Sequence, residues 1–209
     1  MSANGAGAGS VAAVRLRDVA IGLGDVTFRA HEPLAIDLSN IGSSLPLGGL
    51  LGFDFFRRYV VAIDFGTYRV ALYDPASYER AGKGTAIPLV IRPPRAFVWV
   101  TVSARGVPPE RHLLRLDLGS DDAVDDDIVL HSTAPKKRIE SGVGIGQSFA
   151  AYSGTVSELD IGPYKLYDLP SATGGVQLIG DAVWRRFDVI FDFSRSVMYL
   201  TPRHQFSLK

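Results

Sequence analysis

Two stretches of the chain, 128 residues apart, carry the same sequence pattern. Residues 51–72 read LGFDFFRRYVVAIDFGTYRVAL, and residues 179–200 read IGDAVWRRFDVIFDFSRSVMYL. They align without a gap, and seven of the 22 positions are identical. The identical pairs are Gly52/Gly180, Arg57/Arg185, Arg58/Arg186, Val61/Val189, Asp64/Asp192, Phe65/Phe193 and Leu72/Leu200. A repeat of this length indicates a duplicated domain rather than a solenoid.

The repeated stretch predicts a short helix followed by a β-hairpin. In the first copy the helix is expected at Phe53–Arg58, and the hairpin at Tyr59–Phe65 and Arg69–Tyr73. Other short apolar or β-branched runs end at Gly or Pro and predict further strands. These runs are residues 11–21 with 26–28, 87–91, 97–103, 113–118, and 156–161 with 164–169. Residues 38–50 are expected to be a loop, and a short helix is expected to start within Asp121–Leu130. Without a long amphipathic helix, the chain is predicted to be mainly β.

The composition describes a globular chain with balanced charge. Lys and Arg total 22, Asp and Glu total 22, and no basic cluster occurs, so nucleic acid is not an expected partner. No run of 18 apolar residues predicts a membrane span, residues 1–10 lack the pattern of a secretion signal, and the compartment is left open. With no cysteine and four scattered histidines, neither a metal nor a cofactor is expected. Trp99 and Trp184 are expected in the core.

The first copy is shorter than the second. Gly5–Ser10 matches Gly142–Ser148, and Val19–Gly22 matches Leu159–Gly162, which extends the repeat upstream. The second copy has 55 further residues, 87–141, ahead of its glycine segment, whereas the first has only four. We therefore expect an incomplete first repeat at residues 1–75 (copy one), a linker at 76–86 and a complete domain at 87–209 (copy two). Copy one is expected to pack against copy two, because its sheet edges and apolar faces need a cover.

The segment that copy one lacks contains the motif with chemical content. Residues 113–120 read LLRLDLGS, an apolar strand that ends in Asp117 with Gly119 two residues later. Such a sequence places a carboxylate on a tight turn, where backbone N–H groups can bond it. A structural turn that only caps the backbone has the same pattern, so both interpretations stay open at this point.

This motif, together with Leu178-Ile179-Gly180 and the duplicated block, resembles the retropepsin-like aspartic proteases, in particular bacterial aspartyl proteases with two tandem repeats. The resemblance extends over nearly all of residues 5–203. It implies a retropepsin-like acid-protease β-barrel, preceded here by the C-terminal half of another. It also implies an aspartic endopeptidase, in which two aspartates share a proton across an attacking water and the substrate is a peptide or protein.

Carried over by position, the resemblance assigns Asp117 as the catalytic aspartate. Leu118, Gly119 and Ser120 then form the active-site turn, and Ile179 and Gly180 form the loop under that turn. The flap over the substrate would be Gly142, Val143, Gly144, Ile145 and Gly146.

The chain departs from the family pattern in three respects. Leu118 stands where the family has Thr or Ser, which removes a hydroxyl. No partner Asp-x-Gly is expected, so a homodimer or a missing N-terminal half would supply the second aspartate. The acidic residues between Asp121 and Asp127 would disfavour the ionisation of Asp117 if they lie close to it.

The alternative to an active peptidase is a non-catalytic member of the family that binds peptides or dimerises. A Ca²⁺ site in the acidic segment is a weaker third interpretation.

Overall fold

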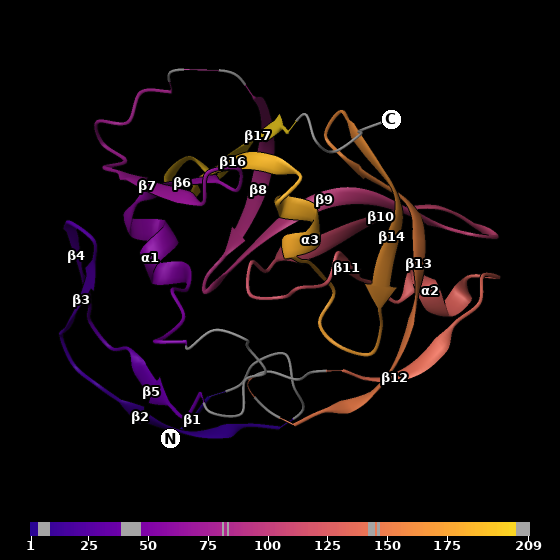
Figure 1. The fold of residues 1–209 in the computed structure, drawn as a ribbon, viewed down its shortest axis with the longest axis horizontal. Coiled ribbons are helices and arrows are strands. Elements are labelled where there is room, and N and C mark those ends of the chain that lie inside the picture. Colours follow the sequence, from indigo (N-terminus) through magenta and orange to yellow (C-terminus); the bar gives the residue numbers. More distant parts are fainter. Residues whose placement is uncertain are drawn as a thin grey trace.

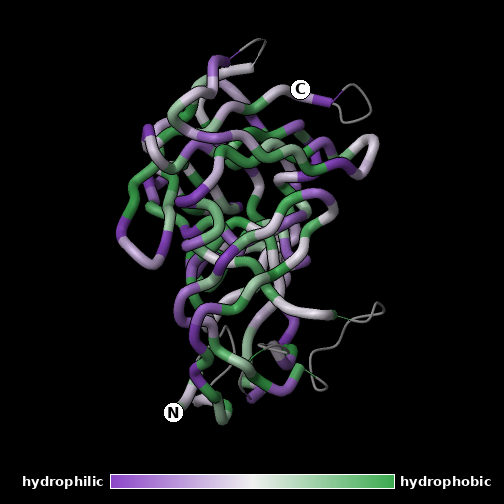
Figure 2. Tube along the Cα trace, turned by 90° about the vertical axis from the view of Figure 1, so that its left-hand side faces the viewer, coloured by the Kyte–Doolittle hydropathy of each residue, from purple (hydrophilic) through white to green (hydrophobic). Residues whose placement is uncertain are grey.

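The computed structural model of the chain describes residues 1–3, 9–38, 47–80, 82, 84–141, 145 and 147–203. Strands account for 55% of the structure and helices for 9%, which confirms the predicted mainly β architecture. Figure 1 shows copy one, in indigo and violet, beside a β-barrel that copy two forms. Apolar and polar segments alternate along the chain (Figure 2), as expected for strands that bury one face.

Copy two closes into a six-stranded barrel. The ring runs β9–β10–β15–β11–β14–β13 and returns to β9, where Leu159 lies opposite Val102. Its strands are β9 (Arg95–Ala104), β10 (Val107–Leu116), β11 (Val124–Asp125), β13 (Phe149–Ile161), β14 (Tyr164–Ala172) and β15 (Leu178–Ile179). β8 (Thr85–Arg92) extends the sheet beyond β9, and β12 (Lys137–Ser141) extends it beyond β13. Alternate residues of β9 are buried, Val98 and Val100 among them, so inward side chains fill the barrel.

The duplicated block forms the same elements in both copies. They are α1 (Phe53–Arg58), β6 (Val60–Asp64) and β7 (Arg69–Tyr73) in copy one, and α3 (Asp181–Trp184), β16 (Phe187–Asp192), η1 (Phe193–Arg195) and β17 (Val197–Pro202) in copy two. The helix and hairpin predicted in copy one are therefore confirmed.

The two blocks meet around a local two-fold axis. β6 pairs antiparallel with β16 so that Ala62 lies opposite Ile190, its own counterpart 128 residues later. The resulting strand order is β8–β17–β16–β6–β7. Aromatic rings strengthen the junction, since Phe56 packs against Phe191 with ring centroids 5.6 Å apart. The expectation that copy one packs against copy two is confirmed.

The remainder of copy one is a thin layer of short strands. β1 (Ser2–Ala3), β2 (Val11–Arg15) and β5 (Leu34–Ile36) form one sheet, and β3 (Val19–Leu23) with β4 (Val26–Ala30) forms a hairpin. The predicted continuous run at 11–21 is wrong, because the chain breaks at Asp18, whose φ is +50°. Phe28, Phe55 and Val61 make a second, much smaller core.

Three other expectations need correction. β10 starts at Val107 rather than near residue 113, because an irregular register between Val107 and Glu110 admits the two prolines. It ends at Leu116, so Asp117 follows the strand. Within Asp121–Leu130 only the start of α2 (Ile128–His131) is helical. Trp184 is buried as expected, but Trp99 is 42% exposed and stacks on the Arg111 guanidinium. Residues 39–46 of the expected loop lie outside the described residues.

Candidate active site

Asp117 stands at the end of a barrel strand, where a parallel neighbour fixes the backbone. β10 pairs with β15 so that Leu116 lies beside Ile179. The backbone N–H of Asp117 donates to the Ile179 carbonyl (3.0 Å), and the Gly119 N–H donates to Oδ1 of Asp117 (3.0 Å). The Asp117 side chain remains 27% exposed. The turn therefore presents a carboxylate that is anchored by its own backbone and still open to solvent.

The backbone of Gly180 packs directly against the backbone that follows Asp117. A Cβ atom on Gly180 would lie 2.2 Å from the Asp122 carbonyl oxygen and 2.8 Å from that of Ser120. Three consecutive N–H groups donate to the turn: Gly180 to Ala123 (3.1 Å), Asp181 to Ser120 (2.7 Å) and Ala182 to Asp122 (3.4 Å). The structure thus brings together the sequence-derived turn, residues 117–120, and the sequence-derived support, Ile179 and Gly180.

Arg115 adds an ion pair that the sequence analysis did not include. Its Nη2 donates to Oδ2 of Asp117, and the Arg115 side chain is only 12% exposed. Both oxygens of Asp117 therefore accept a hydrogen bond. Leu118 packs against the barrel core instead of carrying a hydroxyl into the site.

Asp125 lies on the same face of the sheet as Arg115. Leu178 is the register partner of Arg115 on one side and of Asp125 on the other, so the three side chains share a face. Burial, and then the negative charge of Asp122, raise the pKa of Asp125 to about 7, and Asp117 contributes in the same direction. Its Oδ1 has no hydrogen-bond partner within the described part of the chain. Burial first, and the neighbouring carboxylates second, therefore make ionisation of Asp125 unfavourable.

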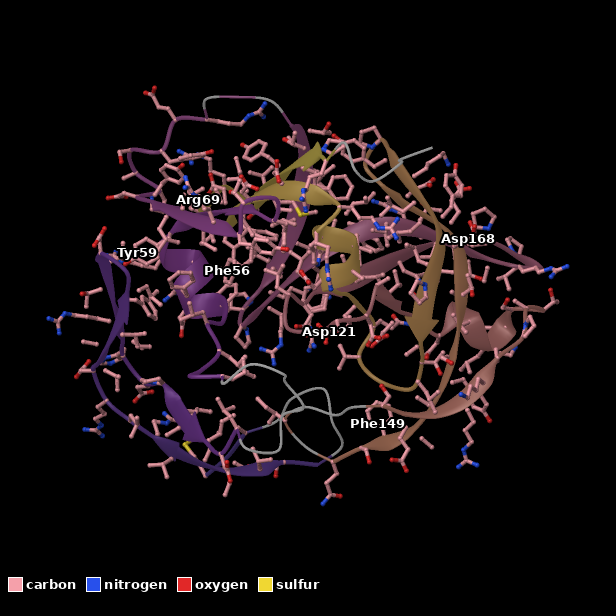
Figure 3. All side chains as sticks on the ribbon, viewed as in Figure 1. Phe56, Tyr59, Arg69, Asp121, Phe149 and Asp168 are labelled. Carbon is pink, nitrogen blue, oxygen red and sulfur yellow. The ribbon has the colours of Figure 1, made fainter. Side chains whose placement is uncertain are left out.

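The flap prediction lies mostly outside the described residues, which include Ile145 but not Gly142, Val143, Gly144 or Gly146. The hairpin that would carry it is present, since β12 pairs with β13 up to Ser141 opposite Phe149. The Phe149 ring reaches the loop between β14 and β15, where a Cβ atom on Gly175 would lie 3.1 Å from the ring. Figure 3 shows Asp121, four residues after Asp117, in the centre of the view, with Phe149 below it.

The expectation of a single Asp-x-Gly in the chain is wrong at the level of sequence. Asp64-Phe65-Gly66 and Asp160-Ile161-Gly162 have the same spacing. Both are hairpin turns, between β6 and β7 and between β13 and β14. Asp64 accepts the N–H groups of Gly66 and Thr67, and Asp160 pairs with Lys165. Neither follows a strand that lies beside a segment like Ile179-Gly180.

No protein-family model matches this chain, and no curated protein matches it either. Geometry alone therefore bears on the site. Within the described residues, no group of three or more His, Asp or Glu side chains is placed to hold a metal ion. In the same part of the chain, no helix is long and apolar enough to cross a membrane.

His112, elsewhere on β10, is partly exposed and pairs with the buried Asp126. Nδ1 of His112 is 2.6 Å from Oδ2 of Asp126, and Nε2 is 3.2 Å from Glu110. Burial lowers the pKa of His112, but the hydrogen bonds and charges of Asp126 and Glu110 outweigh it and raise that pKa overall. Oδ1 of Asp126 also accepts the Ile128 N–H (2.8 Å). This pair fastens α2 to the barrel and takes no part in the Asp117 site.

Proposed function

We propose that the chain belongs to an aspartic endopeptidase of the retropepsin type, for which it supplies Asp117 as one of two catalytic carboxylates. The observation that carries the proposal is the Asp117 turn. It is fixed by the Ile179 carbonyl and by the Gly180 N–H, yet its carboxylate is partly exposed. A carboxylate held in this way binds a water without reorganising, which is the requirement for a general base.

The second carboxylate has to come from another segment. Hydrolysis with two aspartates needs one ionised carboxylate and one protonated carboxyl group on opposite sides of the water. In the described part of copy one, Asp64 is bound to the hairpin that it caps. Asp74 accepts the Ala76 N–H on the turn after β7, but no segment like Ile179-Gly180 supports that turn among the described residues. A two-carboxylate site would therefore need a second turn with an aspartate, placed on copy one.

A second candidate function is non-catalytic peptide binding. The Arg115–Asp117 ion pair favours it, because a guanidinium on Oδ2 competes with the second carboxyl group for the same side of Asp117. In this case the barrel and its hairpin would hold a peptide without cleaving it.

The experiment compares two proteins. One is the purified chain over a range of concentrations, and the other is an extended chain in which residues 85–137 are repeated directly ahead of Met1. Because Gly142 aligns with Gly5, residue 138 aligns with Met1, so the added segment ends at the position that corresponds to residue 137 of copy two. Both are incubated with a random peptide library at mildly acid pH, and cleavage is followed by mass spectrometry.

Hydrolysis in either protein that disappears with Asp117→Asn supports the peptidase proposal. Asp160→Asn is the matched control, because it changes an Asp-x-Gly turn on the surface and is expected to leave cleavage intact. Cleavage that survives Asp117→Asn removes the catalytic assignment. Absence of cleavage in both proteins, and in the extended chain whose added copy of Arg115 is replaced with leucine, leaves the non-catalytic function if peptide binding is retained.

A further inference from the structure

Copy one retains the platform that carries the Asp117 turn in copy two, but no segment among the described residues covers it as that turn does in copy two. Leu50, Leu51 and Gly52 are the counterparts of Leu178, Ile179 and Gly180 at the 128-residue offset. Leu178 and Ile179 are 1% and 0% exposed, whereas Leu50 and Leu51 are 58% and 39% exposed.

The backbone donors of this platform are also unused. In copy two, the N–H groups of residues 180–182 donate to three carbonyls of the turn. Their counterparts, Gly52, Phe53 and Asp54, find no acceptor within the described part of the chain. An occupant that reproduced the copy-two arrangement would offer three carbonyl oxygens to these N–H groups and an apolar strand to cover Leu50 and Leu51.

The backbone conformation of Gly52 does not require a glycine. Its φ is −103° and its ψ is −156°, an extended conformation open to any residue. A Cβ atom there would meet no atom of the described residues within 4 Å, whereas one on Gly180 would collide with the turn. Ser or Asp would also cap α1 better. A close approach of another backbone, of the kind observed at Gly180, would account for this glycine.

The sheet of copy one also has an unpaired edge strand among the described residues. β17 is flanked by β8, with Met198 opposite Ile87, but its counterpart β7 is the last strand of the described sheet. Met198 is fully buried, while its counterpart Val70 is 60% exposed. The β7 edge thus lacks a strand equivalent to β8.

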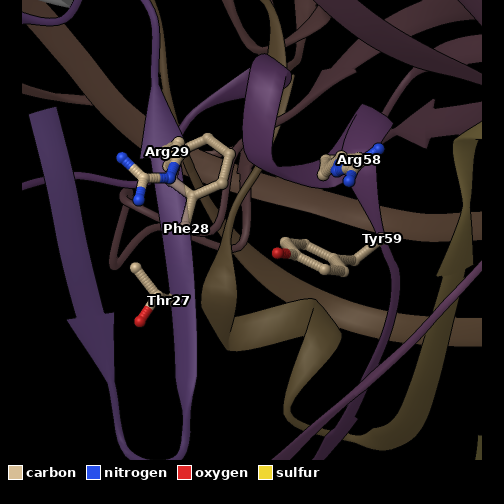
Figure 4. A pocket seen from close by; sticks show the side chains of 5 residues that line it. All are labelled: Thr27, Phe28, Arg29, Arg58 and Tyr59. Carbon is tan, nitrogen blue, oxygen red and sulfur yellow. The ribbon is translucent and has the colours of Figure 1, made fainter. Parts of the chain in front are cut away.

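A hollow beside α1 marks a further gap. It is lined by Thr27, Phe28, Arg29, Arg58 and Tyr59 (Figure 4). The counterpart of Tyr59 is Phe187, which is fully buried against Tyr164. In copy two the equivalent place is filled, because Thr85 of β8 bonds Tyr164 and Tyr164 packs on Phe187. The hollow in copy one is therefore at the place where a strand equivalent to β8 would bring such contacts.

We propose that copy one is a docking surface for a β segment of the kind that residues 85–125 form in copy two: antiparallel strands that end in an Asp-x-Gly turn. One strand pairs with β7, and the turn settles on Leu51 and Gly52. A second copy of this chain does not qualify, because its own turn is held by Ile179 and Gly180. The docking inference goes beyond the proposed function, since it requires no hydrolysis.

Amide hydrogen exchange of the extended chain tests this inference. Exchange at residues 50–54 and 69–73 is expected to slow about tenfold or more relative to the original chain, because these amides gain acceptors. Gly52→Ala in the extended chain is expected to restore fast exchange at 50–54, since its Cβ would meet the docked turn. Gly48→Ala is the matched control, because a Cβ there also meets nothing and it lies outside the platform.

Unchanged exchange at both segments in the extended chain overturns the docking inference, whatever the cleavage result. Slowed exchange without cleavage supports docking and overturns only the peptidase proposal. Slowed exchange in the original chain that rises with its concentration, with dimers in sedimentation, would identify a second copy as the occupant and overturn the inference. If exchange at residues 50–54 stays slow in the Gly52→Ala variant, the added segment lies elsewhere, and the docking inference is overturned as well.

Discussion

Gly180→Ala is predicted to destabilise the chain strongly, although it adds only one methyl group. That group would lie 2.2 Å from the Asp122 carbonyl oxygen and 2.8 Å from the Ser120 carbonyl oxygen, and both are backbone atoms. The turn then has to move away, which also stretches the N–H bonds from residues 180–182. Overpacking of this kind usually costs 1–3 kcal/mol, and we expect about 3 kcal/mol because backbone rather than a flexible side chain has to yield.

Thermal unfolding followed by circular dichroism measures this effect. For a chain of this size, about 3 kcal/mol corresponds to a fall in Tm of roughly 6–12 °C. Gly52→Ala is the matched control at the equivalent position, with the same helix-capping role. We expect it to change stability by less than about 0.5 kcal/mol, because a small capping loss offsets the gain from a stiffer unfolded chain. Equal losses in the two variants would refute the claim that the turn is docked on Gly180 while Gly52 is uncovered.

Two predictions concern pH. The folded-state pKa of Asp125 is raised to about 7, so folding favours its protonated form, and its ionisation withdraws stability as pH rises from about 4 to about 7. Asp125→Asn is therefore expected to match the stability of the original chain at pH 4 and to exceed it by about 2 kcal/mol at pH 8. This is about half the free energy that the full pKa shift would give, because solvent screens a partly exposed group. A stability difference in urea unfolding that stays constant between pH 4 and pH 8 would contradict the assignment. The pKa of His112 is also raised, so its pairing with Asp126 stabilises the fold below pH 6.5 and weakens as pH rises through the folded-state pKa. His112→Gln is expected to lose about 1–2 kcal/mol at pH 5.5 and clearly less at pH 8.5, and a loss that grows with pH would contradict this.

Much of the fold could be predicted because the duplicated block repeats its local signals. Phe53–Arg58 forms the expected helix, and the expected hairpin follows with its turn at Gly66. The failures occur where tertiary context decides. Trp99 lies on the outward face of β9, where Arg111 from β10 covers one side of its ring. Prolines near the start of β10 suggested a loop, but an irregular register accommodates them.

The candidate site was predictable to a smaller extent. The pairing of Asp117 with Ile179 followed from the resemblance, and the ion pair with Arg115 had a signal, because residues two apart on a strand point to one side. No local sequence signal indicated that Asp125 lies on the same face as Arg115. This placement depends on β15 inserting between β10 and β11, which joins segments more than 50 residues apart along the chain. A sequence read locally cannot reveal such a three-strand register.

The Arg115–Asp117 ion pair also constrains what an added turn has to bring. With Oδ2 on the guanidinium and Oδ1 on the Gly119 N–H, Asp117 is arranged as an acceptor on both oxygens. In two-carboxylate hydrolysis the acceptor carboxylate activates the water, so the proton that polarises the peptide carbonyl has to reside on the other carboxyl group. A turn docked on Leu51 and Gly52 therefore completes the proposed chemistry only if its aspartate stays protonated beside Asp117. The extended chain repeats Arg115 as well as Asp117, so both of its turns would be acceptors. Replacing only the added copy of Arg115 with leucine is expected to raise the cleavage rate, and an unchanged or lower rate would show that the ion pair does not divide the two roles.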